Sequence, residues 1–196
     1  YHDYEYHYFL TDIPSVLSGK QIGFLDPHEQ YFAFDPHKRI KQPGKRGKKW
    51  RLSEEILDQF PDQFNPYINP LFNCSRESFA NGTFDGTVFR FPLRNAQMES
   101  QVSSAVYDDE RIQSLFESYQ ADADISLLFL KSVETVELYE RDNEDEEPRL
   151  VFSVGVTEED RAELRDKRKK FLDGVVTPQN DISFSCSMSI SRKVYD

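Results

Sequence analysis

The sequence has few cysteines and no long hydrophobic run, and both features narrow its class. Cys74 and Cys186 are the two cysteines among 196 residues, which excludes a disulfide framework and a zinc site of the Cys-x-x-Cys type. No run of about 18 apolar residues is present, which excludes a transmembrane helix. The chain does not open on a basic segment followed by an apolar one, so we expect no signal peptide. These absences predict a cytoplasmic protein without a membrane partner.

Recognisable catalytic motifs are also missing. The sequence has no Gly-x-Ser-x-Gly, no His-Glu-x-x-His and no Walker loop, and nothing marks a carboxylate pair placed for acid–base catalysis. The tripeptide Asp-Pro-His occurs at 26–28 and again at 35–37, which allows either a metal site or two turns. Asp-Pro starts turns without any metal, so we favour turns and expect neither a catalytic residue nor a metal site.

Aromatic residues and acidic charge are abundant. Sixteen Phe and ten Tyr supply material for a core, in a chain long enough for one ordinary domain or one domain with an appendage. The net charge of −11, from 24 basic and 35 acidic residues, opposes non-specific binding of nucleic acid. We therefore expect a folded protein with no nucleic-acid partner.

One segment, residues 38–51, is strongly basic although the chain as a whole is acidic. Pro43, Gly44 and Gly47 within it predict a loop. We interpret this loop either as solvated and without a partner or as a contact for an anion or an acidic protein. Its basic residues are Lys38, Arg39, Lys41, Lys45, Arg46, Lys48, Lys49 and Arg51.

A helix is predicted from the acids at 108–110, because the apolar residues Ile112, Leu115, Phe116 and Tyr119 follow helical spacing. Asp122-Ala-Asp124 is expected to end this helix. The nearly continuous apolar run at 125–130 then predicts a strand buried on both faces.

Further strands are predicted from alternating apolar residues and turn signals. Residues 133–140 and 149–156 are expected to form an antiparallel hairpin around an acidic tip at 140–147. Residues 21–25 and 31–34 are expected to form another hairpin around Asp26-Pro27-His28-Glu29. A strand over 88–91 ends at Pro92.

The end of the chain predicts one helix and one strand. Thr157 is a candidate N-cap for a helix over 158–172, and Gly174 is a candidate stop. Residues 182–191 alternate apolar and serine side chains, which makes Cys186 a core thiol. The predicted fold is α+β, a two-layer sandwich with helices on one face of a mostly antiparallel sheet. We expect one domain over 1–156 and a second region, helix plus strand, over 157–196.

Four stretches together resemble the large repeats of sacsin-type proteins. They are Leu10-Thr-Asp-Ile-Pro-Ser-Val-Leu-Ser-Gly19, Gly23-Phe-Leu-Asp-Pro-His28, Gly86-Thr-Val-Phe-Arg-Phe-Pro-Leu-Arg94, and Leu115-Phe-Glu-Ser-Tyr-Gln-Ala-Asp-Ala-Asp-Ile-Ser-Leu-Leu-Phe-Leu-Lys-Ser-Val133. These repeats begin with a domain similar to the ATPase domain of the ninety-kilodalton heat-shock chaperones, the Bergerat or GHKL fold. The resemblance covers about residues 8 to 156 and implies a partial Bergerat fold.

The resemblance implies a remnant of a nucleotide pocket at Gly86 and Thr87. In that family a Gly-Thr pair on a strand contributes to nucleotide binding, whereas Asp85-Gly86 here also suits a simple turn before a strand. Arg90 and Arg94 are expected to share one face of this strand, in a structural ion pair or at the pocket. We expect the ion pair, and we expect Arg90→Cys to unfold the domain.

The departures from the family argue against ATP hydrolysis. Tyr8 matches a Tyr that ends the family's Gly-rich lid, Phe9 replaces its His, and residues 1–7 lack glycine. The family's catalytic Glu, magnesium-binding Asn and adenine-binding Asp have no counterpart in this chain. The chain therefore looks like a fragment without the N-terminal part of the domain. We expect no cofactor, with ATP and magnesium bound only if those motifs lie upstream.

Three functions remain open from the sequence. The first is a chaperone or co-chaperone module whose partners are protein clients or other chaperones. The second is a degenerate GHKL scaffold that docks an acidic protein partner through segment 38–51, using Lys45, Arg46, Lys48 and Lys49. The third is a working ATPase whose other half lies upstream.

Overall fold

The computed structural model describes residues 10–35, 37, 40–41, 43–97, 100–130, 132–143, 146–157, 165–167, 169–170, 173–174 and 190–195. The chain divides into two compact units, Tyr1–Asp109 and Glu110–Asp196. Each unit combines antiparallel strands with at least one helix, which confirms the predicted α+β class. The predicted domain boundary after residue 156 stays a prediction.

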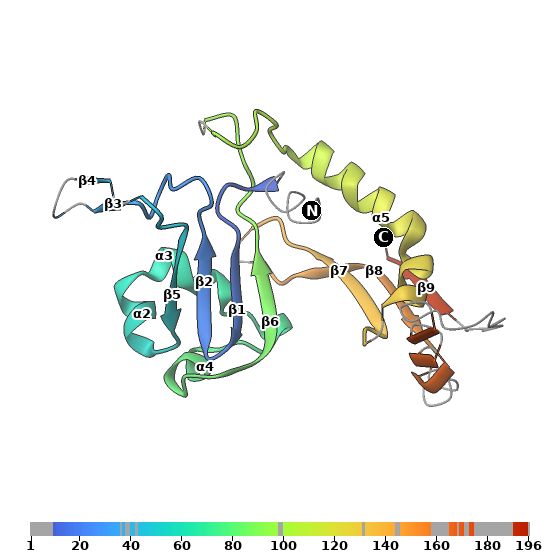
Figure 1. Cartoon of the computed structure of the whole chain (residues 1–196). Helices are drawn as coiled ribbons and strands as arrows, with labels where there is room; N and C mark the ends of the chain where they lie inside the picture. The colour runs from blue at the N-terminus through green and yellow to red at the C-terminus, as the bar shows by residue number, and fades with distance from the viewer. Residues whose placement is uncertain are drawn as a thin grey trace. The chain divides into compact units, whose positions relative to one another are not determined.

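The first unit is built on a four-stranded antiparallel sheet in the order β5-β2-β1-β6 (Figure 1). Gly19 has a φ of 57°, a left-handed conformation that glycine adopts without strain, and it turns the first strand directly into the second. A separate short pair joins β3 (Phe34–Asp35) to β4 (Ile40–Lys41). The strands of the large sheet are β1 (Ser15–Gly19), β2 (Gln21–Leu25), β5 (Gly47–Arg51) and β6 (Phe84–Arg90).

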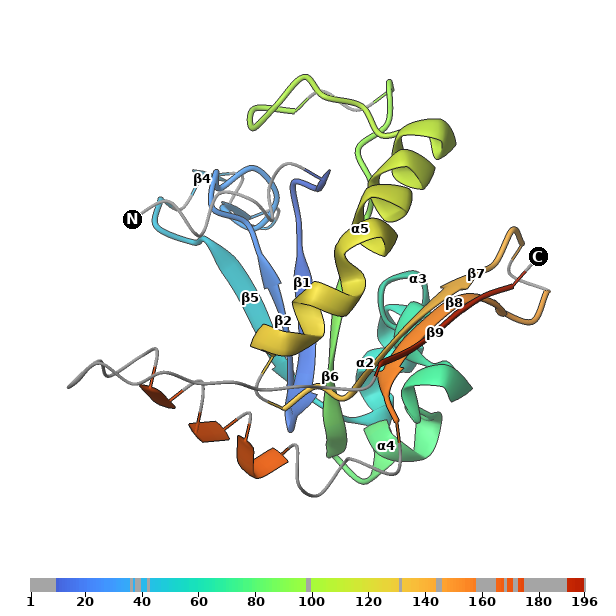
Figure 2. The same ribbon diagram turned by 90° about the vertical axis from the view of Figure 1, so that its right-hand side faces the viewer.

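Three short helices, α2 (Glu54–Gln59), α3 (Pro61–Phe64) and α4 (Arg76–Ala80), lie on one face of this sheet (Figure 2). Two 3-10 turns, η1 (Asn65–Tyr67) and η2 (Pro70–Phe72), connect α3 to α4. The predicted two-layer arrangement is therefore present in this unit. The core between the layers consists of Leu17, Ile22, Phe24, Leu52, Ile56, Leu57, Phe64, Tyr67, Cys74, Phe79 and Phe84.

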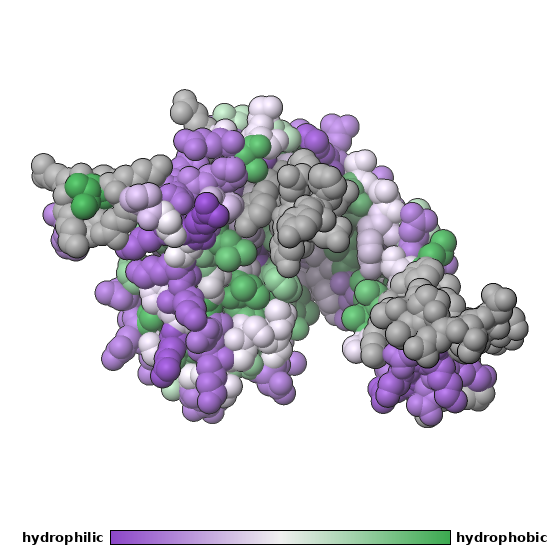
Figure 3. Space-filling view, in the orientation of Figure 1, coloured by the Kyte–Doolittle hydropathy of each residue, from purple (hydrophilic) through white to green (hydrophobic). Residues whose placement is uncertain are grey.

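The opposite face of the sheet is exposed and partly apolar. Because side chains alternate along each strand, Val16, Leu25 and Phe89 project away from the core. Leu25 is 47% exposed and Phe89 is 61% exposed. The space-filling view shows hydrophobic side chains gathered over these strands (Figure 3). We call this surface, with Ser18, Gly23 and Lys49, the open sheet face.

The predicted hairpin between 21–25 and 31–34 is wrong. Strand β2 pairs with β1 and β5 instead. The Asp26 carboxylate accepts hydrogen bonds from the backbone N–H groups of Gln30, Tyr31 and Phe32, at 3.0, 2.8 and 2.8 Å. These bonds curl residues 26–32 into a turn, so the chain does not run back along β2. The turn interpretation of the first Asp-Pro-His is therefore confirmed.

Segment 38–51 is not the uninterrupted loop that its composition predicts. Its residues 40–41 form β4 and its residues 47–51 form β5. Pairing with β2 outweighs the low strand propensity of Lys, because Trp50 on β5 packs against the core. Lys45 and Arg46 lie in the connection before β5, whereas Lys48 and Lys49 lie on the strand itself.

The second unit contains a long helix and a three-stranded antiparallel sheet in the order β7-β8-β9. The strands are β7 (Thr135–Glu140), β8 (Arg149–Val156) and β9 (Ile190–Val194). The predicted hairpin between 133–140 and 149–156 is confirmed. A register shift between Leu138 and Tyr139 skips one residue of β8. Val151 and Phe152, which are adjacent in sequence, are accordingly both buried.

The predicted strand over 125–130 is wrong. Helix α5 (Asp109–Phe129) begins at the predicted place but continues through Asp122 and Asp124 into this apolar run. Among its described side chains, Ala123 and Leu127 are buried, four positions apart, and they pack with Val151, Phe152 and Val154. The apolar residues whose spacing predicted the helix do not form its buried face. Leu115, Phe116 and Tyr119 are all exposed.

Two predictions fall largely outside the described residues. Of the helix predicted over 158–172, residues 165–167 and 169–170 are described as helical, and residues 173–174, at the predicted stop, are helical as well. Of the strand predicted over 182–191, only its last two residues are described, in β9, and Cys186 is not among them.

Candidate functional site

An aromatic cavity of about 490 Å³ opens in the first unit, beside the helix-facing side of the sheet. Its volume lies within the range of about 300–1,000 Å³ that is typical of ligand pockets. Residues from β2, β5, α3 and the end of β6 converge there, which explains why no single stretch of sequence marks it. The lining residues are Thr11, Asp12, Ile13, Phe24, Tyr31, Phe32, Lys48, Trp50, Phe60, Gln63, Phe64, Arg90 and Pro92.

The wall of the aromatic cavity is a set of rings packed edge to face. The centroid of the Trp50 ring lies 5.6 Å from those of Phe24 and Phe64, with interplanar angles of 83° and 81°. Phe32 lies 6.3 Å from both Phe24 and Trp50. Such contacts fix ring orientations and add about 0.5–1.5 kcal/mol per pair beyond area burial. The wall is therefore an ordered apolar surface.

Two cationic side chains line the aromatic cavity. Lys48 lies two residues before Trp50 on β5, so both side chains project to the helix-facing side. Lys48 Nζ lies 4.6 Å from the Trp50 ring centroid, a cation–π distance. Arg90, the last residue of β6, also lines the cavity. The arrangement suits a ligand that combines an apolar group with a negative charge.

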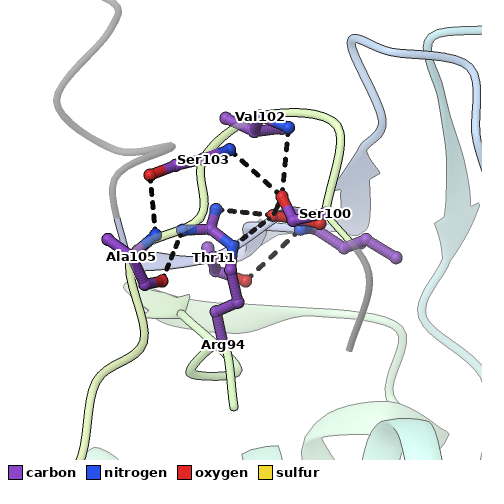
Figure 4. Close-up of polar contacts among 8 residues, drawn as sticks. Thr11, Arg94, Ser100, Val102, Ser103 and Ala105 are labelled. Carbon is purple, nitrogen blue, oxygen red and sulfur yellow. Dashed lines mark hydrogen bonds and ion pairs between the residues drawn. The ribbon is translucent and has the colours of Figure 1, made fainter. Parts of the chain in front are cut away.

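A buried ion pair joins Arg94 to Asp12, which is one of the residues that line the aromatic cavity (Figure 4). Asp12 Oδ1 accepts hydrogen bonds from Arg94 Nε at 2.8 Å and from Arg94 Nη2 at 2.5 Å. Ser100 Oγ donates a third bond to the same oxygen at 2.9 Å. Arg94 Nη1 donates to the Ala105 carbonyl at 3.3 Å. Arg94 thus joins the segment before β1 to the segments after β6.

The carboxylates near the cavity affect Tyr31. Burial raises the pKa of the Tyr31 phenol, and the negative charges of Asp12 and Asp26 raise it further, while Arg94 acts in the opposite direction. The neutral phenol is therefore favoured. Tyr31 is 40% exposed, so it forms part of the rim of the cavity.

Gly86 and Thr87 lie away from the aromatic cavity. Thr87 pairs with Ser18 across β1 and β6, and their hydroxyl oxygens lie 2.9 Å apart. Ser18 Oγ also donates to the Gly86 carbonyl at 3.2 Å. A Cβ at Gly86 would lie 2.9 Å from the ring of Phe84, which explains a glycine at this position. Thr87 therefore belongs to the open sheet face.

The other predicted residues are divided between surfaces. Lys48 and Arg90 line the aromatic cavity, whereas Lys49 pairs with Gly23 on the open sheet face. Lys45 is exposed, and Arg46 Nε lies 3.5 Å from Oε1 of the half-buried Glu29. Arg94 lies beyond the end of β6, so it does not share a strand face with Arg90 as expected.

Sequence reasoning missed the aromatic wall. Trp50 is the one Trp of the chain, and its place between Lys49 and Arg51 gave no sign of a cavity. In the described part of the chain, no group of three or more His, Cys, Asp or Glu side chains is placed to hold a metal ion. Across the same residues, no helix is long and apolar enough to cross a bilayer.

Comparison with known proteins agrees with the sequence resemblance. The family model described as "Sacsin domain" matches residues 4–153. Human sacsin is 43% identical to this chain over 153 residues, which are 77% of this chain and 3% of human sacsin. The chain thus spans a small part of the length of this curated relative. On both findings, the chain belongs to the sacsin-domain family.

Proposed function

We propose that this chain is a protein-binding module of a sacsin-like chaperone or co-chaperone that acts in protein folding or quality control. The observation that carries the proposal is the open sheet face, where Leu25 and Phe89 are exposed and where Lys49 adds a charge at the β5 edge. Exposed apolar patches with a polar border are typical of surfaces that bind other proteins. Unfolded or assembling clients present the apolar segments that such a surface binds.

We also propose that the first unit is a partial Bergerat fold without competent ATP hydrolysis. The motifs that carry the catalytic Glu, the magnesium-binding Asn and the adenine-binding Asp in that family are absent from this sequence. The Thr87 hydroxyl, which the resemblance places near a nucleotide, is hydrogen-bonded to Ser18. We expect millimolar magnesium-ATP to leave the melting temperature of the chain unchanged, whereas a raised melting temperature would favour a working nucleotide site.

Suppression of aggregation tests the client-binding role. The chain is added to a heat-unfolded reporter enzyme, and light scattering is followed with the parent and with Phe89→Ser. We expect the parent to suppress aggregation and Phe89→Ser to lose most of that effect. Phe72→Ser is the matched control, because Phe72 is an exposed Phe on η2 rather than on the open sheet face. Equal suppression by all three proteins would contradict the role of this face.

The alternative is a docking domain that captures an acidic partner through segment 38–51. Lys48 at the aromatic cavity is the specific observation that favours it. Replacing Lys45, Arg46, Lys48 and Lys49 by Gln separates the two functions. Only the docking function predicts that partner capture collapses and that capture by the parent depends strongly on salt.

A further inference from the structure

The outer edge of β5 has backbone groups that pair with no other strand among the described residues. At the two ends of the β2–β5 ladder, the Asp26 N–H donates to the Arg46 carbonyl and the Leu52 N–H donates to the Lys20 carbonyl. These two bonds establish which residues of β5 are hydrogen-bonded to β2. Hydrogen-bonded pairs alternate in an antiparallel ladder, so Lys48 and Trp50 direct their backbone groups toward β2. Gly47, Lys49 and Arg51 therefore direct theirs outward. In the described part of the chain, no element pairs with that edge.

The two sides of this edge differ in chemistry. Trp50 and the aromatic cavity lie on the helix-facing side, together with Phe60, the residue just before α3, which is 39% exposed. The exposed side chains of Lys49 and Arg51 lie on the other side. A strand added to β5 would place alternate side chains against an apolar cavity and against two cations.

From this geometry we propose that β5 binds an extended acidic segment of a partner protein as an additional antiparallel strand. Residues of the partner opposite Lys49 and Arg51 are acidic, and a large apolar residue opposite Trp50 enters the aromatic cavity. Backbone bonds to the edge supply affinity, and the cavity and the cations supply specificity. The inference rests on the proposed function in that it assumes a protein-binding module, and it adds the site and the chemistry of one partner.

Charge selects this occupant over a second copy of the chain. Antiparallel pairing of two β5 edges would place Lys49 and Arg51 opposite the same cations, and like charges directly opposite are destabilising. An acidic strand replaces this repulsion with attractive cross-strand pairs. The basic edge therefore resists self-association and remains available to an acidic partner, although the whole chain carries a net charge of −11.

A synthetic peptide of sequence Glu-Val-Glu-Trp-Glu-Val-Glu, labelled with a fluorophore, tests the pairing against the full 196-residue chain. Antiparallel docking makes the Glu N–H groups face β5 and leaves the Val and Trp N–H groups facing outward. N-methylation of the Glu that follows the Trp should weaken binding at least about tenfold. N-methylation of a Val is the matched control and should have little effect. Equal weakening by both peptides would overturn strand pairing.

A charge exchange tests the cations. Lys49→Glu with Arg51→Glu should abolish binding of the acidic peptide and allow binding of Lys-Val-Lys-Trp-Lys-Val-Lys. Phe60→Ala should weaken the acidic peptide about tenfold, while Phe72→Ala should not. Parental melting temperatures of the variants establish that each one folds. An affinity for the acidic peptide that is unchanged by both the charge exchange and Phe60→Ala would overturn the proposal. Displacement of the peptide by magnesium-ATP would also overturn it.

The peptide experiment and the aggregation experiment test different surfaces, so either one can fail without the other. Peptide binding without suppression of aggregation would support the β5 site and count against the role of the open sheet face. Suppression without peptide binding would overturn the β5 site and leave the chaperone role intact. A concentration-dependent dimer that the Lys49→Glu and Arg51→Glu changes abolish would show that a second copy occupies the edge, which also overturns the proposal.

Discussion

Arg94 and Asp12 form an ion pair in which both side chains are almost completely buried, with 2% and 4% of their surfaces exposed. They are 82 residues apart in sequence. The pair holds the segment that precedes β1 against the segments that follow β6, and its Asp12 is one of the residues that line the aromatic cavity. The stability of the first unit should therefore depend strongly on this contact.

The first prediction concerns Arg94→Ala. Removing the guanidinium leaves the Asp12 carboxylate buried without its cation, which costs about 3–5 kcal/mol in comparable sites. We expect chemical denaturation to show a loss of this size in the stability of the first unit. Arg76→Ala is the control, because its ion pair with Asp58 is solvent-exposed and should contribute less than about 1 kcal/mol. Similar losses for the two variants would contradict the importance of burial.

The second prediction concerns Asp26, whose carboxylate accepts three backbone hydrogen bonds from residues 30–32. Asp26→Ala leaves these N–H groups without their acceptor and should destabilise the first unit by about 2–3 kcal/mol, measured by urea unfolding. Asp26→Asn keeps one acceptor oxygen and should lose less. If the Asn variant is as unstable as the Ala variant, the three bonds are not the source of the stabilisation.

The third prediction concerns alkaline pH and Tyr67. Burial raises the pKa of its phenol above 10.0, while a hydrogen bond with Ser15 and then the charge of Arg90 act in the opposite direction. A raised pKa stabilises the folded protein below the unfolded pKa, and that stability is lost as pH rises through the folded pKa. We expect Tyr67→Phe to lose less stability than the parent between about pH 9 and pH 11. Parallel curves for the two proteins would disagree with this assignment.

The fourth prediction distinguishes helix from strand over 125–130. Leu127 is fully buried against β8, whereas Ile125 is 55% exposed. Leu127→Ala should destabilise the second unit by about 2–5 kcal/mol through loss of packing and creation of a cavity. Ile125→Ala should be nearly neutral, because Ala also favours helix. Equal destabilisation would instead indicate a strand buried on both faces.

Local pairing is the part of the fold that the sequence reveals best. The β7–β8 hairpin is predicted correctly because alternating residues flank a short acidic tip. The run at 125–130 misleads because a short apolar segment fits either a buried strand or the buried end of a helix. The β2–β5 pairing is missed because 21 residues separate the two strands, and no local signal reports a contact at that distance.

The candidate site is less predictable than the fold. Lys48 and Arg90 are singled out from charge and strand pattern, and both line the aromatic cavity. Trp50, Phe24 and Phe64 are ordinary core aromatics in sequence, and their grouping exists only after β5, β2 and α3 pack together. Arg94 is recognised as a candidate for an ion pair, but its partner lies too far away in sequence to be named.

The long separation between Arg94 and Asp12 has a consequence for synthesis of the chain. Strand β1 leaves the ribosome before its neighbour β6 and the residues that enclose Arg94, up to Ala105, which follow some 70 to 90 residues later. Contacts between distant residues form slowly because the intervening loop must close first. During that interval the hairpin of β1 and β2 displays its core-facing side. The core-facing side of this hairpin is therefore covered only after β6 has been synthesised.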